Sequence, residues 1–324
     1  MFRIKIKEDK SHGIEEKSIL LQYKNAVLPI HRKKESNTLY ESINTWCINF
    51  LNIPFENVIC ASPKELMYIR DCLDVLSDNG CALDVDMADY LKNTLYPGLN
   101  RKMKKKNAKT ILLEALDLIV CPYCNRNYIY NIKSSNAKQV SASCELDHYL
   151  PKDEYPLLAV SFYNLIPSCH FCNHTKGRKQ LKAFYPYGEE VEDADQIRFT
   201  YIPLAPDYIT NKKSVIVDIN VHYNSGKSLH KCPEWNKSNI EHDLDILKLR
   251  QLYEKHNDVV QKLLLKYKTL DDSYVQAIYD NFKRYFVSKE EVKCLIYDTP
   301  NDTQDIKDIP LGKLKTDILS ELYS

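Results

Sequence analysis

Apolar residues recur at helical spacing through the first third of the chain, and this pattern predicts a mainly helical N-terminal region. Residues 2–7 are an exception, because their alternation of apolar and basic residues is typical of a strand. Ser62, Pro63 and Glu65 form a capping box with proline in the first turn, which marks the start of a helix. The helices predicted here cover about 39–51, 62–76, 85–95 and 110–120. Residues 1–110 form one region, whose sequence indicates no chemistry.

The last part of the chain combines two strand-like runs with amphipathic helices. Residues 197–201 and 214–221 have the β pattern, and spaced apolar positions predict one long helix over about 240–269. Two more helices are predicted over about 273–285 and 312–323. We therefore predict three regions, 1–110, 111–187 and 188–324. The last region holds a β-hairpin-like segment, helices and a candidate surface for a protein partner.

The composition is that of an ordinary globular protein. Of the 324 residues, 44% are hydrophobic and 27% are charged, which argues against disorder. Even the apolar run 111–121 contains Glu114 and Asp117, so no stretch of 18 apolar residues is present and we expect no membrane association. The N-terminus has no apolar core of a signal peptide, which predicts a cytoplasmic protein.

Glycine is scarce, and its spacing excludes two nucleotide-binding motifs. No two of the seven glycines lie closer than eleven positions. The phosphate-binding loop GxxxxGK[ST] and the dinucleotide turn GxGxxG both need glycines a few residues apart. We expect this chain to bind no nucleotide cofactor, so any ATP-driven step requires another polypeptide.

Charge is distributed unevenly, although the whole chain carries only +1. Residues 101–187 contain 14 Lys and Arg against 6 Asp and Glu, a net charge of +8, and the remainder carries −7. A basic segment in an acidic chain favours a surface that faces a polyanion such as nucleic acid. A solvated lysine face explains the same charges, so charge alone leaves both interpretations open.

Four of the eleven cysteines form two C-x2-C pairs, Cys121 with Cys124 and Cys169 with Cys172, separated by 44 residues. Two such pairs in a chain with reduced thiols predict one tetrahedral zinc ion held by four thiolates. With four sulfur ligands the zinc has no open position for water, so its role is structural. A thioredoxin-like redox pair would need a βαβ pattern, which is not evident around these motifs.

The cysteine pairs frame residues with catalytic chemistry. Asp147 and His148 lie in E-L-D-H, Asn164 lies in Y-N-L-I-P-S-C, and Asn173 lies in C-N-H-T-K-G. With C-P-Y-C, these motifs resemble the HNH endonucleases, and especially the PtuB-type HNH proteins of bacterial anti-phage Septu and retron systems. The resemblance is specific across residues 121–179, about a fifth of the chain, and is weaker outside them, where it rests mainly on the helix around 252–256.

The resemblance implies an α+β fold, a mainly α-helical protein with a central zinc-stabilised ββα-metal (HNH) finger within 111–187. It implies a metal-dependent endonuclease that hydrolyses phosphodiester bonds of DNA, as the nuclease effector of an anti-phage defence complex. A separate ATPase subunit encoded nearby is the partner that the resemblance implies. It also makes Asn164 a brace for the loop that carries His148, and places Asn173 at the family's position directly after the last cysteine.

The residue types suit this reaction, which needs an activated water and a cation for the developing charge. His148 can be neutral at pH 7 and take a proton from water. Asp147 and the neutral oxygen of Asn173 suit Mg²⁺ or Mn²⁺, and two protein ligands leave room for waters and phosphate. Because adjacent strand residues point to opposite faces, Asp147 and His148 share a site only where the strand bends or ends. Pro151 favours such an end.

The short helix after the last cysteine holds candidates for phosphate binding. Lys176, Arg178 and Lys179 are predicted to contact the DNA backbone, with a solvated helix face as the alternative. His174 is either a further phosphate contact or a surface residue. Since neighbouring helical residues project about 100° apart, only one of Asn173 and His174 faces the metal, and an inward His174 would favour a softer transition metal. Glu145, on the same strand face as Asp147, either supports the metal or lies on the surface.

A second interpretation gives the chain no catalysis. A zinc finger can hold nucleic acid without cutting it, and the long C-terminal helix can make the chain a scaffold subunit. Such a module needs the four cysteines but not Asp147. The order of Asp-His, Asn and Asn among the cysteines favours the nuclease, because binding alone gives no reason for it.

Overall fold

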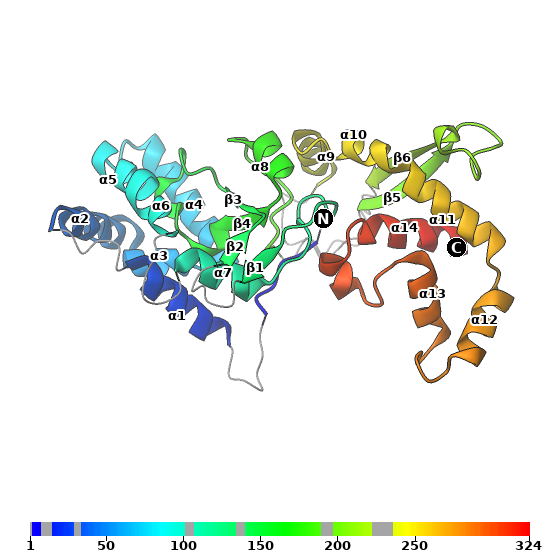
Figure 1. The fold of residues 1–324 in the computed structure, drawn as a ribbon. Coiled ribbons are helices and arrows are strands. Elements are labelled where there is room, and N and C mark those ends of the chain that lie inside the picture. Colours follow the sequence, from blue (N-terminus) through cyan, green and yellow to red (C-terminus); the bar gives the residue numbers. More distant parts are fainter. Residues whose placement is uncertain are drawn as a thin grey trace. The chain divides into compact units, whose positions relative to one another are not determined.

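The computed structural model describes residues 2–7, 15–28, 34–100, 107–133, 140–188, 197–221 and 236–324, which are mostly helical with small sheets (Figure 1). The basic run 101–106 and Cys232 lie outside the described residues. The chain divides into two compact units. The first unit comprises Ile4–Leu118 and Ile129–Gln180, and the second comprises Met1–Arg3, Ile119–Tyr128 and Leu181–Ser324. In the described ranges, no helix is both long and apolar enough to cross a membrane.

The first unit joins the N-terminal helices to the segment that carries most of the predicted site. Its helices are α1 (Glu16–Val27), α2 (Lys34–Leu51), α3 (Phe55–Ile59), α4 (Pro63–Asp78), α5 (Val85–Tyr90), a π-helix (Leu91–Leu95), α6 (Tyr96–Gly98), α7 (Ala108–Leu116) and α8 (His170–Lys176). Its strands are β1 (Asn131–Lys133), β2 (Val140–Ala142), β3 (Glu145–His148) and β4 (Leu165–Ser168), paired as β1–β2 and β3–β4. Residues 4–110 belong to the same unit as β3, β4 and α8.

Local sequence signals explain some of the helix boundaries, whereas other boundaries differ from the prediction. The capping box is present as predicted: the Ser62 hydroxyl accepts from the Glu65 amide, and the Glu65 carboxylate accepts from the Ser62 amide. α7 ends before the predicted Val120, because Asp117 adopts the left-handed conformation with φ 44°. Residues 2–7 form no strand in the structure. The predicted helix 85–95 begins as α5 and continues as the π-helix and α6, through Pro97, which stands in the first turn of α6 where proline is tolerated.

The N-terminal helices pack against the loop between β3 and β4. The buried Tyr23 hydroxyl of α1 donates to the Val160 carbonyl at 3.0 Å, and the Ser161 hydroxyl donates to the carbonyl of Val58 in α3 at 2.8 Å. A buried polar group without a partner costs free energy. These two hydrogen bonds therefore fix the path of the loop, together with its apolar contacts. The loop includes two short 3₁₀ turns, Pro156–Leu158 and Phe162–Asn164.

β3, β4 and α8 follow one another and form the core of the predicted site. The two strands pair antiparallel, with Glu145 opposite Ser168 and His148 opposite Leu165. α8 begins two residues after β4 and packs against β3. β3 ends at His148, as the geometry of a shared site for Asp147 and His148 requires.

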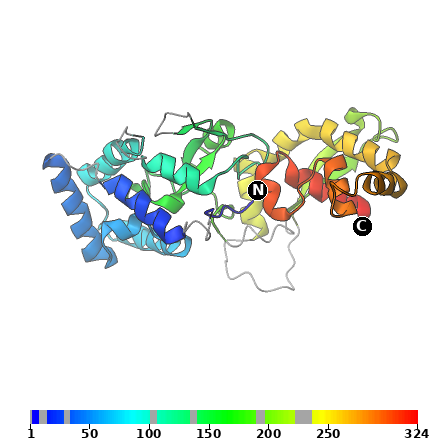
Figure 2. The same ribbon diagram turned by 60° about the horizontal axis from the view of Figure 1, so that its bottom comes forward.

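In the second unit, helices cover the antiparallel pair of β5 (Ile197–Pro203) and β6 (Val215–Val221). α14 lies against β5 and α11 lies against β6, and both views show this arrangement (Figures 1 and 2). The predicted long helix over 240–269 is interrupted, because Lys248 has a left-handed backbone with φ 54° that ends the helical hydrogen bonding. The helices of this unit are α9 (Lys237–Ile246), α10 (Leu249–Tyr253), α11 (Asn257–Thr269), α12 (Asp272–Asn281), α13 (Lys289–Tyr297) and α14 (Gly312–Tyr323).

Candidate functional site

The four predicted zinc cysteines come together. Their Sγ atoms all lie within 4.8 Å of one another, and all four residues are buried. A tetrahedral zinc with Zn–S bonds of about 2.3 Å holds its sulfurs about 3.8 Å apart, so small movements would bring this cluster to zinc geometry. Four thiols, with no histidine, aspartate or glutamate in the same group among the described residues, fit a closed structural site. The cluster could therefore bind zinc.

A tight turn presents the first cysteine pair. The Asn125 amide donates to the Cys121 carbonyl at 2.7 Å, and the Cys121 amide donates to the Asn127 carbonyl at 2.9 Å. Asn125 has a left-handed backbone with φ 46°, which asparagine tolerates better than most residues. Its buried side chain donates to the Ile306 carbonyl at 2.7 Å and accepts from the Lys313 amide at 3.0 Å. Asn125 thus ties the turn to the second unit's C-terminal segment.

Replacing Asn125 with alanine is expected to lower the free energy of unfolding by about 2–4 kcal/mol. The change leaves the Ile306 carbonyl and the Lys313 amide without their buried partner and keeps a less tolerant residue at positive φ. Urea titration followed by circular dichroism measures the loss. The matched control is Asn220→Ala, at an exposed position of β6 in the same unit, which should stay within about 0.5 kcal/mol of the wild type. Equal stability of the two variants would contradict the role of Asn125.

Asp147 is buried and forms an ion pair with a buried lysine. The Lys176 Nζ atom lies 3.1 Å from Asp147 Oδ1 and donates to the His148 carbonyl at 2.6 Å. Lys176 is fully enclosed, with no exposed surface. This placement does not fit the predicted contact of Lys176 with DNA phosphates, because an enclosed ammonium with two partners presents no donor to a backbone outside. Lys176 instead holds the end of β3 against α8 and offsets the charge of Asp147.

The His148 imidazole is held in one protonation state by its surroundings. Its Nε2 atom lies 3.0 Å from the Ala159 carbonyl, which can only accept, so Nε2 carries the hydrogen and Nδ1 of the neutral ring keeps its lone pair. Burial lowers the pKa of His148 to about 4, and the positive charges of Lys152 and Lys176 act in the same direction. The ring is therefore neutral at pH 7, with Nδ1 able to take a proton.

Tyr96 forms one wall of the His148 environment, and sequence reasoning missed it. The two ring centroids lie 4.5 Å apart, and the Tyr96 hydroxyl donates to the Leu146 carbonyl of β3 at 3.3 Å. Burial, together with the nearby charges of Asp147 and Glu145, raises the pKa of Tyr96 to about 12. Tyr96 directly follows the π-helix, a rare conformation that often marks functional sites. No motif in residues 1–110 pointed to this contact, because it depends on tertiary packing alone.

The depressed pKa of His148 predicts a pH-dependent loss of stability. Between pH 6.5 and about 4 the unfolded chain binds a proton at this residue and the folded chain does not, so acid favours unfolding. We expect the wild type to lose about 2 kcal/mol more free energy of unfolding than His148→Gln between pH 7 and pH 5. Urea titrations of both proteins at the two pH values measure the difference, and subtraction removes the contribution of every other titrating group. Equal losses would show that the pKa of His148 is not depressed.

Asn164 braces the loop that follows His148. Its buried side chain accepts from the Leu150 amide at 2.8 Å and donates to the carbonyls of Leu150 and Leu158 at 3.1 and 2.9 Å. The Asn164 carbonyl also accepts from the Tyr149 amide at 2.9 Å. These bonds join the residues just before β4 to the turn after β3.

Asn173 lies on α8 and contacts Glu145 of β3. Its Nδ2 atom donates to Glu145 Oε2 at 2.5 Å, which leaves its Oδ1 atom as the oxygen that can bind a cation. His170 Nδ1 lies 2.7 Å from Glu145 Oε1, and His174 Nε2 lies 3.8 Å from Glu145 Oε2. Although burial acts to raise it, the pKa of Glu145 is lowered, because Asn173 and His170 hydrogen-bond the carboxylate and both histidines favour its charge. The structure thus links Asp147 and Asn173 to different partners, Lys176 and Glu145.

The remaining predicted phosphate contacts are exposed. His174, Arg178 and Lys179 all present their side chains to solvent, and Arg178 Nε lies 3.1 Å from Asp153 Oδ2. Exposed basic and polar side chains near the site satisfy the first requirement for contact with the backbone of a polyanion. Their exposure leaves these three side chains accessible to nucleic acid, whereas Lys176 is enclosed.

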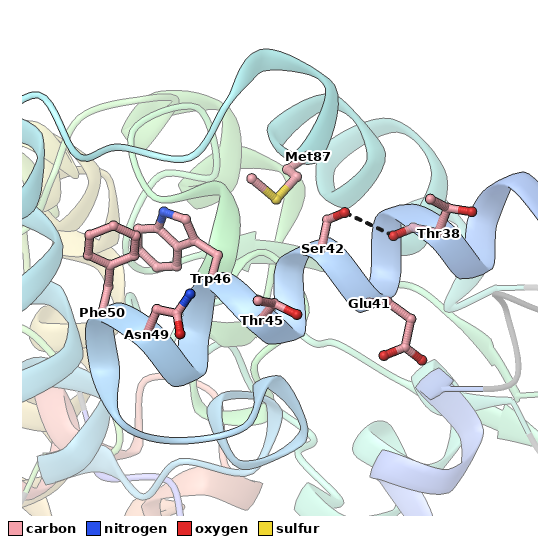
Figure 3. Close-up of a pocket in the computed structure, with 8 residues that line it drawn as sticks. All are labelled: Thr38, Glu41, Ser42, Thr45, Trp46, Asn49, Phe50 and Met87. Carbon is pink, nitrogen blue, oxygen red and sulfur yellow. Dashed lines mark hydrogen bonds between the residues drawn. The ribbon is translucent and has the colours of Figure 1, made fainter.

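A pocket of about 450 Å³ lies elsewhere, over one side of α2 (Figure 3). Trp46 and Phe50 form its apolar end, and the Ser42 hydroxyl donates to the Thr38 carbonyl at the other. The residues that line it are Thr38, Glu41, Ser42, Thr45, Trp46, Asn49, Phe50 and Met87. None of the predicted site residues lines this pocket, so it is separate from the chemistry of β3 and α8.

Comparison with known proteins gives a local match. The Septu protein PtuB of Bacillus thuringiensis is 43% identical to this chain over 60 residues, which cover 16% of this chain and 23% of that protein. The match thus spans about a quarter of the relative's length. No protein-family model matches the chain, and no solved structure matches it.

Proposed function

We propose that the chain is a metal-dependent endonuclease of the HNH type, which hydrolyses phosphodiester bonds of DNA within an anti-phage defence complex. The single observation that carries the proposal is the imidazole of His148, which is neutral, has a fixed tautomer and follows Asp147 at the end of β3. The local similarity to Septu PtuB supports the defence role. The arrangement β3, β4 and α8 beside the four cysteines supports a ββα-metal finger.

His148 is the proposed general base. The Ala159 carbonyl orients the ring through Nε2–H, and Tyr96 packs on its face, so that Nδ1 is the atom that accepts the proton from the attacking water. A low pKa keeps the imidazole unprotonated across the physiological range, at the cost of a weaker base. Asn164 is the proposed positioning residue, because it fixes the turn that follows His148.

Asp147 and Asn173 are the proposed ligands of a divalent cation, Mg²⁺ or Mn²⁺. Each offers an oxygen, and hard oxygen donors are what these cations prefer. When bound, such a cation stabilises the charge that develops on the phosphate. Lys176 holds the buried Asp147 carboxylate in place through their ion pair. Glu145 holds the Asn173 amide so that its oxygen is the free donor.

DNA and an ATPase subunit are the proposed partners. His174, Arg178 and Lys179 are the exposed cationic or polar side chains proposed to meet the DNA backbone. A separate ATPase fits a chain whose glycine spacing excludes the common phosphate-binding loops. These partners extend the proposal beyond the 60 residues that match PtuB.

Conversion of supercoiled plasmid DNA tests the proposal. The full chain, with the product of any neighbouring ATPase gene, is incubated with plasmid and Mg²⁺ or Mn²⁺, and nicked and linear forms are quantified. A nuclease converts the plasmid only when the cation is present. A binding module retards the plasmid in a gel and leaves its supercoiling unchanged, which would favour the non-catalytic alternative.

A further inference from the structure

A second cluster of metal-binding side chains lies on the solvent side of β3 and α8. We propose that Glu145, His170 and His174 form a site for a divalent first-row transition-metal ion such as Ni²⁺, Co²⁺ or Zn²⁺. One ligand atom from each residue lies within 4.8 Å of the other two. The distances from Glu145 are 2.7 Å to His170 Nδ1 and 3.8 Å to His174 Nε2.

The helix places the two imidazoles side by side. His170 and His174 are four residues apart on α8, and residues at this spacing project from the same helical face. Their ring centroids lie 3.9 Å apart. Two histidines at this spacing on one face are an established way for a helix to chelate a metal ion. Glu145, on the neighbouring strand β3, supplies the third ligand.

The donor set selects the class of metal. Imidazole nitrogens suit Ni²⁺, Co²⁺, Cu²⁺ and Zn²⁺, whereas Mg²⁺ prefers oxygen ligands. Two histidines and one carboxylate supply three ligands, which is the number that open sites use. The cluster therefore differs in chemistry from the four-thiol site, which is closed, and from Asp147 with Asn173, which offer only oxygen.

The site is open to solvent and partly organised before any ion binds. The side chains of His170, His174 and Glu145 are 72%, 65% and 38% exposed, so an ion there keeps positions for water or an outside ligand. The Asn173 amide hydrogen-bonds Glu145 and fixes the carboxylate, in the way that outer partners orient metal ligands. The inference rests on these contacts and stands whether or not the chain cuts DNA.

Calorimetric titration with Ni²⁺ tests the site. The full chain is first loaded with one zinc per chain and then titrated. We expect the wild type to bind one further equivalent, and the double variant His170→Ala/His174→Ala to bind it at least about 100-fold more weakly. Glu145→Gln should weaken binding about 10-fold, because the amide keeps one oxygen but loses the charge. The control is His242→Ala, since His242 lies beside a single carboxylate and is not part of a cluster of three ligands among the described residues.

A second measurement avoids substitutions altogether. Ni²⁺ should protect His170 and His174 of the wild type from acylation by diethyl pyrocarbonate, as mapped by mass spectrometry, and leave His242 reactive. No further equivalent of Ni²⁺ in the wild type, equal affinity in the double variant, or protection spread evenly over the three histidines would each overturn the proposal. Zinc content and circular dichroism of each variant show that it is folded before its affinity is compared.

Discussion

Replacing His148 with alanine is expected to reduce metal-dependent cleavage of plasmid DNA by about 10²–10⁴-fold, the usual contribution of a general base. The substitution removes the Nδ1 lone pair that the Ala159 carbonyl leaves available on the ring beside Tyr96. The initial rate of nicking, measured with Mg²⁺ or Mn²⁺ and with any partner that the wild type needs, reports the loss. Zinc content and circular dichroism should match the wild type.

The matched control removes a histidine from outside the proposed site. His242→Ala, in α9 of the second unit, should cleave at the wild-type rate. Cleavage by His148→Ala at that same rate would overturn the role of His148, because no structural effect of the substitution could restore a missing base. Gel retardation of plasmid by His148→Ala separates chemistry from binding, since a base contributes to the rate and not to affinity.

Removal of metal from the four-cysteine cluster is expected to unfold the segment around it. Structural zinc sites in small domains contribute on the order of 10 kcal/mol or more at pH 7, which is comparable to the whole stability of an ordinary protein. Cys172→Ser removes one of four buried ligands and should abolish the single equivalent of zinc. Colorimetric titration of released metal and loss of the cooperative unfolding transition measure the effect.

Cys81→Ser is the control for the zinc ligand. Cys81 lies after α4 in the first unit and is half-buried, and its thiol donates to the Asn79 carbonyl. Its replacement by serine should keep one zinc per chain and the wild-type transition. Retention of one tightly bound zinc by Cys172→Ser would contradict the assignment, as would insensitivity of the wild type to a strong chelator.

Elements with a local cause could be predicted from the sequence. The start of α4 at Ser62 and Pro63 followed from side chain and backbone bonds within four residues. β5 and β6 carry the predicted β pattern, and α14 begins and ends where its apolar positions do. The four cysteines could also be foreseen, because zinc chemistry demands both the residue type and the pairing.

Features decided by tertiary packing could not be predicted. The break at Lys248 leaves the apolar periodicity of α9, α10 and α11 intact, so the pattern indicated one helix. Lys176 is a basic residue in a basic segment, and only the fold shows that it is enclosed against Asp147. The contact of Tyr96 with His148 spans more than fifty positions, and neither residue carries a signal for the other.

The packing of Tyr96 on the His148 ring has a consequence for any attempt to shorten this chain to its motifs. A fragment starting at residue 111 would keep every motif of the HNH resemblance but would lack Tyr96. One face of the His148 imidazole would then be exposed to bulk water. Water there would return the pKa of His148 toward its ordinary value and free the ring to rotate. Transferring residues 121–179 to another scaffold would therefore require an aromatic residue of that scaffold in the place of Tyr96.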